Sequence, residues 1–352
     1  MDMKAKVWFG TVVAGTLSLL AVIAGYIIVV DPFFHYHKPL NGIAYELANE
    51  RYQNDGIVKH FSYDTVITGT SMTANFKTTD CDAFFGGKSI KVPFHGGSFK
   101  EVNDNLKVAL AYNPNVVRVI RCLDINNFTQ DKDYVNYEDL PEYLYDDNIF
   151  NDTQYVWNKT ALMLADDIVI NTAAGEQGTT FDEYMNWSDD YEYGREAVLA
   201  TYVRPGKWEH AERLTDMERE QTLGNVRQNV TDLARQYPQV EFDYYLSPYS
   251  ICWWDAEVVQ PGKLSWQRDL DQTVIEEILT CDNIHLYSYM DNFELICDLD
   301  NYKDRIHYGG EINTNLLRWM SEDKGRITKE NYREYLDRVY DYYGEYDYDS
   351  LY

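Results

Sequence analysis

The chain has few basic residues for its length, and it lacks several motifs that identify large protein classes. Its 352 residues include 31 Lys and Arg against 58 Asp and Glu, which gives a formal net charge of −27. No basic stripe is present, so we expect no nucleic acid as a partner. Neither G-x-x-x-x-G-K-[ST] nor G-x-G-x-x-G occurs, and nucleotide binding is therefore unsupported.

Cysteine is also scarce, with five residues and no C-x-x-C pair. An odd number of cysteines at these spacings does not force a disulfide, although a location outside the cytoplasm would permit one. No zinc signature is present, and we expect no metal site.

One long hydrophobic segment is present, and it runs without a charge from Val7 to Val30. This length is enough for a helix to cross a hydrocarbon core of about 30 Å. Lys4 and Lys6 precede it and Asp31 follows, which predicts a cytoplasmic N-terminus and an extracytoplasmic main domain. A cleaved signal peptide would have a shorter apolar region, of roughly 7–15 residues, and an A-x-A site. We therefore favour an uncleaved single-pass anchor in the cell membrane.

From Tyr63 onwards, short apolar runs alternate with amphipathic stretches. The apolar runs predict five strands, at residues 64–69, 89–94, 115–123, 240–248 and 283–289. The stretches between them predict helices at about residues 99–112, 209–237 and 263–279, with a last one from Gly310. Strands separated by helices of this length indicate an α/β fold, in which helices cover both faces of a parallel sheet.

The composition also divides the chain into regions. We expect a cytoplasmic N-terminus (1–6), an anchor (7–30), an interfacial segment and connector (31–62), a main domain (63–325) with an insertion at about 125–208, and a Tyr/Asp-rich tail (326–352). Phe33, Phe34 and Tyr36 suit the level of the lipid headgroups. The insertion could shape a substrate cleft or be decoration, and the end of the tail is expected to lie outside the core.

Polar groups follow the carboxyl ends of the predicted strands, where ligands bind in such sheets. Ser71 follows the first strand, Gly96 and Gly97 follow the second, and the loop 124–127 follows the third. The sequence Asp304-Arg-Ile-His307 follows the fifth. A serine esterase needs a serine, a histidine that takes its proton, a carboxylate that orients the histidine, and N–H groups for the oxyanion. Each group alone has an ordinary interpretation, and Ser71 alone would suit a helix N-cap.

Taken in this order, "GTSM", the glycines, the polar loop and "DRIH" resemble the SGNH (GDSL-like) hydrolase superfamily. Together with "DPFFHYHKPL", they are similar to membrane-anchored cell-envelope SGNH-like proteins of Gram-positive bacteria. The resemblance covers roughly residues 60–320 and implies a three-layer α/β/α sandwich of flavodoxin-like type with a mainly parallel five-stranded sheet. It also implies Ser71 as nucleophile, His307 as base and Asp304 as its orienting carboxylate. Ser71 and Gly97, or its neighbour Gly96, would donate N–H groups to the oxyanion.

Two positions depart from the family pattern. The first block reads "GTSM" and not "GDSL", and Asp124 stands where the family has an Asn that donates to the oxyanion. An ionised Asp124 would repel the developing charge. Three interpretations stay open: Asn126 donates in its place, burial keeps Asp124 protonated, or Asp124 serves another reaction.

Three further residues are candidates for the lining of the site. His95 adjoins the glycines, and Trp253 and Trp254 follow the fourth strand. Aromatic rings stack on sugars, so the tryptophans could form a carbohydrate platform, although packing is the commoner role of such pairs.

The sequence thus predicts an extracytoplasmic serine esterase or acyltransferase. Its substrate would be an acetyl or alanyl group on a cell-envelope glycan or teichoic acid, it would need no cofactor, and it could work with a membrane acyl-transfer partner protein. The alternative is a catalytically inactive SGNH-fold protein that assembles the envelope or binds glycan.

Overall fold

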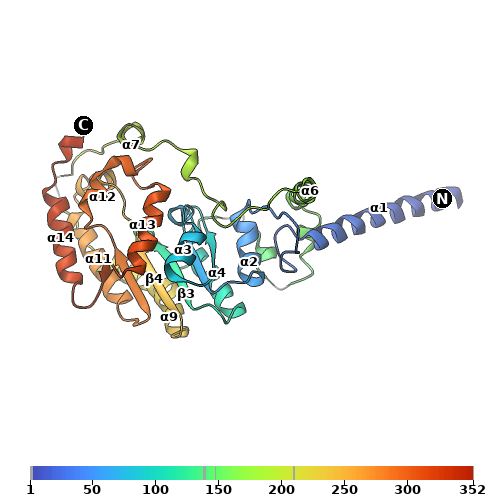
Figure 1. The fold of residues 1–352 in the computed structure, drawn as a ribbon, viewed down its shortest axis with the longest axis horizontal. Coiled ribbons are helices and arrows are strands. Elements are labelled where there is room, and N and C mark those ends of the chain that lie inside the picture. The colour runs from blue at the N-terminus through green and yellow to red at the C-terminus, as the bar shows by residue number, and fades with distance from the viewer. Residues whose placement is uncertain (1–2, 138–139, 147, 209–210, 352) are drawn as a thin grey trace. The chain divides into compact units, whose positions relative to one another are not determined.

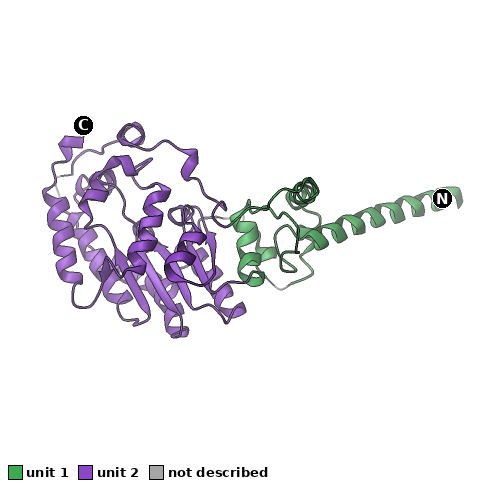
Figure 2. Cartoon of the chain, in the orientation of Figure 1, with its two compact units in different colours: residues 1–61, 139–180 green, residues 62–138, 181–352 purple. Residues whose placement is uncertain are grey.

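A computed structural model describes the chain apart from residues 1–2, 138–139, 147, 209–210 and 352 (Figure 1). The chain forms two compact units, which Figure 2 colours separately. Unit 1 contains residues 1–61 and 139–180, and unit 2 contains residues 62–138 and 181–352. The insertion that we expect at about 125–208 is therefore divided, and its middle part belongs to the same unit as the N-terminal helix.

Unit 2 contains a six-stranded sheet in the order β2-β1-β3-β4-β5-β6. The strands are β1 (Thr65–Gly69), β2 (Ser89–Pro93), β3 (Arg118–Leu123), β4 (Glu241–Leu246), β5 (Ile284–Ser288) and β6 (Arg326–Ile327). The first five pair in parallel and lie within the five predicted runs, which confirms the α/β fold class. The sixth pairs antiparallel with β5 and was not predicted, because two residues carry no readable pattern.

Helices cover both faces of this sheet. One face has α3 (Thr78–Phe85) packed beside α13 (Gly310–Ser321), and the other has α4 (Phe99–Tyr112), α8 (Asp216–Val226), α9 (Asp232–Gln236) and α11 (Leu264–Ile278). A π-helical turn, η5 (Arg227–Thr231), joins α8 to α9. Further helical elements of unit 2 are α7 (Arg195–Thr201), α10 (Ile251–Trp253) with the π turn η6 (Trp254–Val259), α12 (Phe293–Cys297), η7 (Leu299–Asn301), η8 (Tyr348–Leu351) and the short 3-10 turn η4 (Ser188–Asp190).

The C-terminal region is part of unit 2, which corrects the expectation that its end lies outside the core. Helix α14 (Tyr332–Glu345) packs against α11. Its buried side chains recur at three- and four-residue steps, so they form one face. The Tyr343 ring stacks on that of Trp254, with centroids 4.0 Å apart. Leu351 is also buried. The aspartates made this tail read as polar, whereas its tyrosines provide the contact surface.

Unit 1 is helical among its described residues. Its elements are α1 (Met3–Val30), α2 (Glu50–His60), η3 (Glu142–Leu144), α5 (Thr153–Val156) and α6 (Lys159–Ala174). Helix α1 is long and apolar enough to cross a membrane.

The chain turns sharply after α1, and this turn corrects one prediction. Asp31 is buried, has φ 49°, and its carboxylate accepts backbone N–H groups from His35, Tyr36 and His37. The turn folds Phe33 and Phe34 inward, where they are 1% and 0% exposed. These two rings therefore pack inside unit 1 and do not face lipid headgroups as expected.

Candidate active site

Ser71 lies directly beyond the carboxyl end of β1, at the start of a 3-10 turn, η1 (Ser71–Thr73). The chain enters this turn through Gly69, whose φ is 145°. A Cβ on Gly69 would lie 2.9 Å from the Cβ of Cys122, so a larger residue would not fit between β1 and β3. The half-buried Ser71 Oγ lies 2.9 Å from His307 Nε2. The nucleophile and base candidates, far apart in sequence, are thus within hydrogen-bond distance.

The histidine in turn contacts Asp304, since Nδ1 of His307 lies 2.7 Å from Asp304 Oδ2. The other carboxylate oxygen accepts the backbone N–H groups of Ile306 and His307, each at 2.9 Å. Burial alone would raise the pKa of Asp304, but the bonds from the His307 ring and from these N–H groups lower it to about 2. Asp304 is therefore ionised at neutral pH and holds the imidazole by a charged hydrogen bond.

The loop that carries this pair is closed at its base. Tyr302 and Tyr308 form an isolated antiparallel bridge, and Lys303 N–H donates to the His307 carbonyl at 3.0 Å. The segment after β4 supports the loop, because the backbone N–H and the hydroxyl of Ser250 both donate to the Arg305 carbonyl. The position of His307 is thus set by backbone bonds as well as by Asp304.

The turn after β2 shows which glycine can face an oxyanion. Gly97 N–H donates to the Phe94 carbonyl at 2.8 Å, which closes a turn with Gly96 at φ 62°. The expectation for Gly97 is therefore corrected, since its N–H is already used within the turn. The turn's own hydrogen bond does not use the Gly96 N–H, and this N–H donates no backbone hydrogen bond to another described residue, so Gly96 becomes the candidate. His95, half-buried, occupies the position before it.

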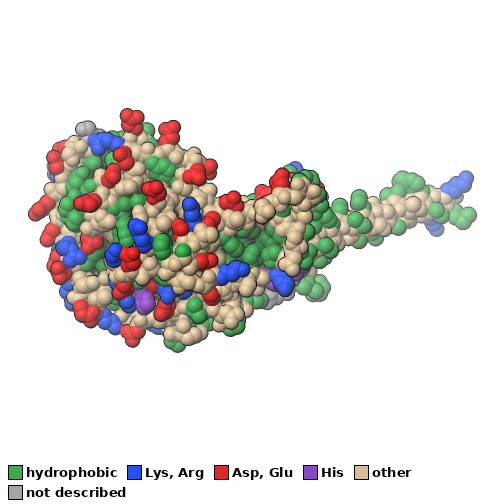
Figure 3. Space-filling model, viewed as in Figure 1, with side chains coloured by type: hydrophobic (Ala, Val, Ile, Leu, Met, Phe, Trp, Pro, Cys, Tyr) green, Lys and Arg blue, Asp and Glu red, His purple; other side chains and the backbone are tan. Residues whose placement is uncertain are grey.

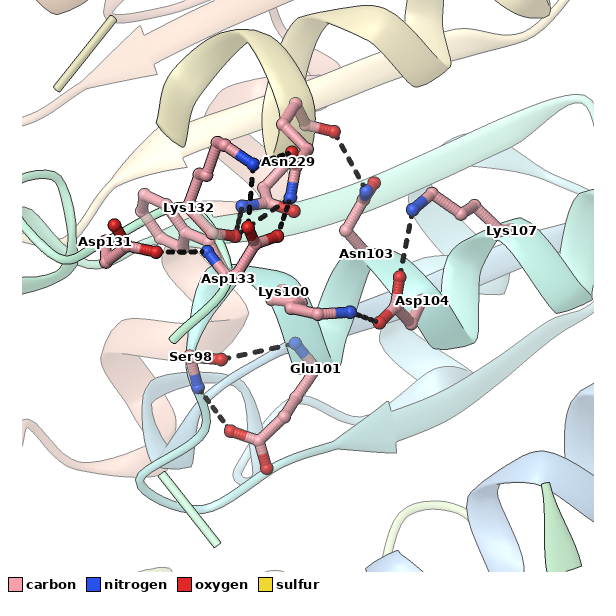
Figure 4. Close-up of polar contacts among 12 residues, drawn as sticks. Ser98, Lys100, Glu101, Asn103, Asp104, Lys107, Asp131, Lys132, Asp133 and Asn229 are labelled. Carbon is pink, nitrogen blue, oxygen red and sulfur yellow. Dashed lines mark hydrogen bonds and ion pairs between the residues drawn. The ribbon is translucent and has the colours of Figure 1, made fainter. Parts of the chain in front are cut away.

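Side chains around this turn hold it in place. The Gly96 carbonyl accepts Asn136 Nδ2 at 2.7 Å, and the Gly97 carbonyl accepts Asn127 Nδ2 at 3.1 Å. Directly after the turn, α4 begins with a capping box in which Ser98 and Glu101 exchange side-chain and backbone bonds (Figure 4). The candidate donor Gly96 thus lies on a well-supported turn.

The loop after β3 places its two asparagines differently. Asn126 is exposed on the 3-10 turn η2 (Ile125–Asn127), whereas Asn127 is buried. Among the described residues, Asn126 makes no hydrogen bond to Ser71 or His307, so its expected role as oxyanion donor gains no support. Asn127, which sequence reasoning did not select, instead joins this loop to the glycine turn after β2.

Asp124 is engaged by two hydroxyl groups. Thr70 Oγ1 donates to one carboxylate oxygen and Tyr249 Oη to the other, both at 2.5 Å. Burial raises the pKa of Asp124, while these two donors act to lower it. Thr70, the threonine of "GTSM", is therefore bonded to Asp124. The side chain of Asp124 links the ends of β1, β3 and β4.

The tryptophan platform is a wrong prediction. Trp253 and Trp254 are 2% and 1% exposed, so neither ring is accessible to a sugar. Trp254 is covered by Tyr343, and Trp253 lies against Tyr249 with centroids 5.2 Å apart. Packing, the commoner role of such pairs, applies here.

A different tryptophan, Trp187, lies at the site and was missed. Its Nε1–H donates to the Ser71 carbonyl at 3.3 Å, and its ring meets the His307 ring at 88° with centroids 5.3 Å apart. Lys303 Nζ lies 4.3 Å from the Trp187 centroid and 3.3 Å from that of Tyr191. No local pattern marks Trp187, because it lies in an irregular part of the expected insertion.

Among the described residues, no group of three or more His, Cys, Asp or Glu side chains could hold a metal ion.

No family model matches the chain, and no curated protein matches it. The chain is similar to a solved structure described as "a putative platelet activating factor from Streptococcus pneumonia". The likeness has a TM-score of 0.38 and 10% identity, and covers 82% of this chain and 91% of that chain.

Proposed function

We propose that the protein is a membrane-anchored, extracytoplasmic serine esterase or acyltransferase of SGNH type. The observation that supports this most directly is the continuous chain from Ser71 Oγ through the His307 ring to Asp304, with contacts of 2.9 and 2.7 Å. Such a chain meets the requirement for an activated hydroxyl nucleophile. The substrate would be an acetyl or alanyl ester on a cell-envelope glycan or teichoic acid.

In this reaction, Ser71 Oγ attacks the acyl carbonyl while His307 Nε2 takes the hydroxyl proton. His307 then returns the proton to the departing sugar oxygen, and an acyl-serine remains. In the second half, His307 takes a proton from water, or from a hydroxyl of a second sugar, as its oxygen attacks the acyl-serine carbonyl. The bond from the acyl carbon to Ser71 Oγ then breaks, and His307 returns the proton to Oγ. Asp304 stays ionised throughout and stabilises the imidazolium that forms in both halves.

The tetrahedral intermediates need donors for their oxyanion. We assign this role to the backbone N–H groups of Ser71 and Gly96. Asp124 does not donate, because both of its oxygens already accept a hydroxyl hydrogen bond. We assign it the task of holding Thr70, and with it the turn that carries Ser71.

Helix α1 would anchor the enzyme in the cell membrane, with Lys4 and Lys6 on the cytoplasmic side. This places the esterase close to lipid-linked and wall-linked glycans. A membrane protein that delivers acyl groups across the bilayer would be its partner if the reaction is a transfer.

The test is labelling of the full chain in detergent micelles with a serine-reactive fluorophosphonate. We expect the wild type to be labelled, Ser71→Ala to abolish labelling, and His307→Ala to slow it by about 10³-fold or more. Ser321→Ala is the control, because Ser321 is an exposed serine on α13. An unlabelled wild type that still binds glycan, with binding unaffected by Ser71→Ala, would instead favour the inactive glycan-binding protein.

A further inference from the structure

A group of exposed apolar side chains lies in unit 1, within residues 149–170, which we call the α5–α6 segment. Ile149 and Phe150 precede α5 and are 73% and 85% exposed. Trp157, between the two helices, is 49% exposed. Met163 and Ile170 lie on the same face of α6 and are 56% and 62% exposed. Large apolar side chains with this exposure, all within residues 149–170, indicate an interaction surface.

The α5–α6 segment lies alongside the apolar helix α1. Both α5 and α6 contact α1. Two side-chain bonds set the alignment: Trp157 Nε1–H donates to the Leu20 carbonyl at 3.1 Å, and Tyr26 Oη donates to Asp166 Oδ1 at 2.9 Å. The segment is thus aligned with the last part of α1, and Figure 3 shows apolar side chains along the exposed length of that helix.

The length of α1 gives the depth of this alignment in a bilayer. A hydrocarbon core of about 30 Å takes up about 20 helical residues. Counted from Val7, the first residue after Lys6, that length ends near Tyr26. Leu20 precedes Tyr26 by about 9 Å along the helix axis. If α1 spans the membrane, Trp157 therefore reaches below the outer boundary of the hydrocarbon core.

We propose that the α5–α6 segment is embedded in the outer leaflet beside α1 and that lipid covers its exposed apolar side chains. This inference rests on the proposed membrane anchoring by α1. The Trp157 ring then contacts acyl chains, and its N–H donates to the Leu20 carbonyl of α1. A tryptophan near the membrane interface needs such an acceptor for its N–H. Asp166 bonds Tyr26 at the boundary, where a charged side chain keeps access to water. The anchor is then a transmembrane helix together with a surface-embedded segment.

The experiment places a photocrosslinking residue in the full chain, reconstituted in phosphatidylglycerol/phosphatidylcholine vesicles. The test variants are Phe150→p-benzoylphenylalanine and Met163→p-benzoylphenylalanine. Val12 in α1 is the membrane reference, and Met217, which is 77% exposed on α8 in unit 2, is the water reference. These positions are solvent-accessible, so the substitutions leave the packing intact, and thermal melting of each variant checks this.

We expect lipid adducts at positions 150 and 163 at yields at least about tenfold above position 217 and near that at position 12. Adducts at position 12 but only background at 150 and 163 would overturn the embedded segment and leave the anchor standing. Background at position 12 as well would overturn the anchor itself. Crosslinks from 150 or 163 to protein and not to lipid would show that a protein partner covers this surface, against the proposal.

Discussion

At the residue scale, the two oxygens of Asp304 have different tasks. One bonds the His307 ring, and the other accepts two backbone N–H groups of the same loop. The carboxylate therefore fixes both the tautomer of the imidazole and the loop that carries it. The pKa of Asp304 is about 2, below its ordinary value. These contacts therefore contribute to the free energy of unfolding above about pH 4, and the contribution is lost as the pH falls from about 4 to about 2.

Asp304→Asn tests the orienting role. An amide can donate to Nδ1 and so favours the wrong imidazole tautomer, and we expect the fluorophosphonate labelling rate to fall by about 10³–10⁴-fold. Labelling rates of the full chain in micelles measure this. Asp282→Asn is the control, since its side chain is 95% exposed. Equal rates for the two variants would remove Asp304 from the proposed mechanism.

Trp187 is the second residue-scale feature, and we propose that it positions Ser71 and His307. Trp187→Phe keeps a ring beside His307 but removes the N–H that bonds the Ser71 carbonyl. We expect kcat for p-nitrophenyl acetate to fall by about fivefold to twentyfold with KM nearly unchanged, which is about 1–2 kcal/mol of transition-state stabilisation.

Trp187→Ala should lower kcat further, because it also removes the ring contact with His307. Trp208→Phe is the matched control, at a tryptophan that is 63% exposed. A rise in KM with kcat unchanged would indicate that Trp187 binds substrate and does not position the nucleophile.

At the element scale, one buried lysine connects β2 to the segment that follows the nucleophile. Lys91 Nζ donates to the carbonyls of Ala74 at 2.5 Å and Phe76 at 2.9 Å, and lies 3.4 Å from that of Asp182. Burial lowers the pKa of Lys91 to about 7, with Asp182 acting in the opposite direction. The Lys91 amine, held by backbone carbonyls, thus supports the loop beyond Ser71.

This predicts a pH dependence of stability. Between about pH 7 and pH 10 the unfolded chain keeps the Lys91 proton while the folded chain releases it, so the unfolded state binds more protons. The free energy of unfolding of the wild type, relative to that of Lys91→Met, should therefore rise from pH 7 to pH 9. Urea unfolding in micelles, followed by tryptophan fluorescence, measures the difference.

Lys329→Met is the control, because the Lys329 side chain is 60% exposed. Its difference from the wild type should stay flat across the same range. A flat difference for Lys91→Met as well would show that Lys91 keeps its proton in the folded state at pH 9.

At the scale of the whole molecule, the strongly negative chain is joined to a single apolar helix. A net charge of −27 disfavours adsorption to anionic lipid, so the proposed membrane association would come from apolar burial. Washing membranes at high pH and high salt should therefore leave the full chain in the pellet, and only detergent should release it.

Leu17→Arg, in the middle of α1, should lower the inserted fraction, at a cost of about 2.5–3.5 kcal/mol. Release by salt alone would contradict anchoring by α1.

Sequence patterns and structure agree most closely where the signal is local. Five strand positions could be predicted because a buried parallel strand is a continuous apolar run between turn residues. Ser71, Gly96, Asp304 and His307 could be selected because they follow such runs. The short β6 and the buried face of α14 could not, since the first has two residues and the second is masked by interspersed aspartates.

The sequence by itself determined the α/β class, the apolar helix and the set of residues at the strand ends, because periodicity and charge spacing are properties of neighbouring residues. The tertiary structure decided how those residues are used. It assigned the Gly97 N–H to a turn, buried Trp253 and Trp254, and brought Trp187 to the nucleophile. These outcomes depend on which distant segments meet. Hydrogen-bond partners and burial arise only when the chain closes on itself.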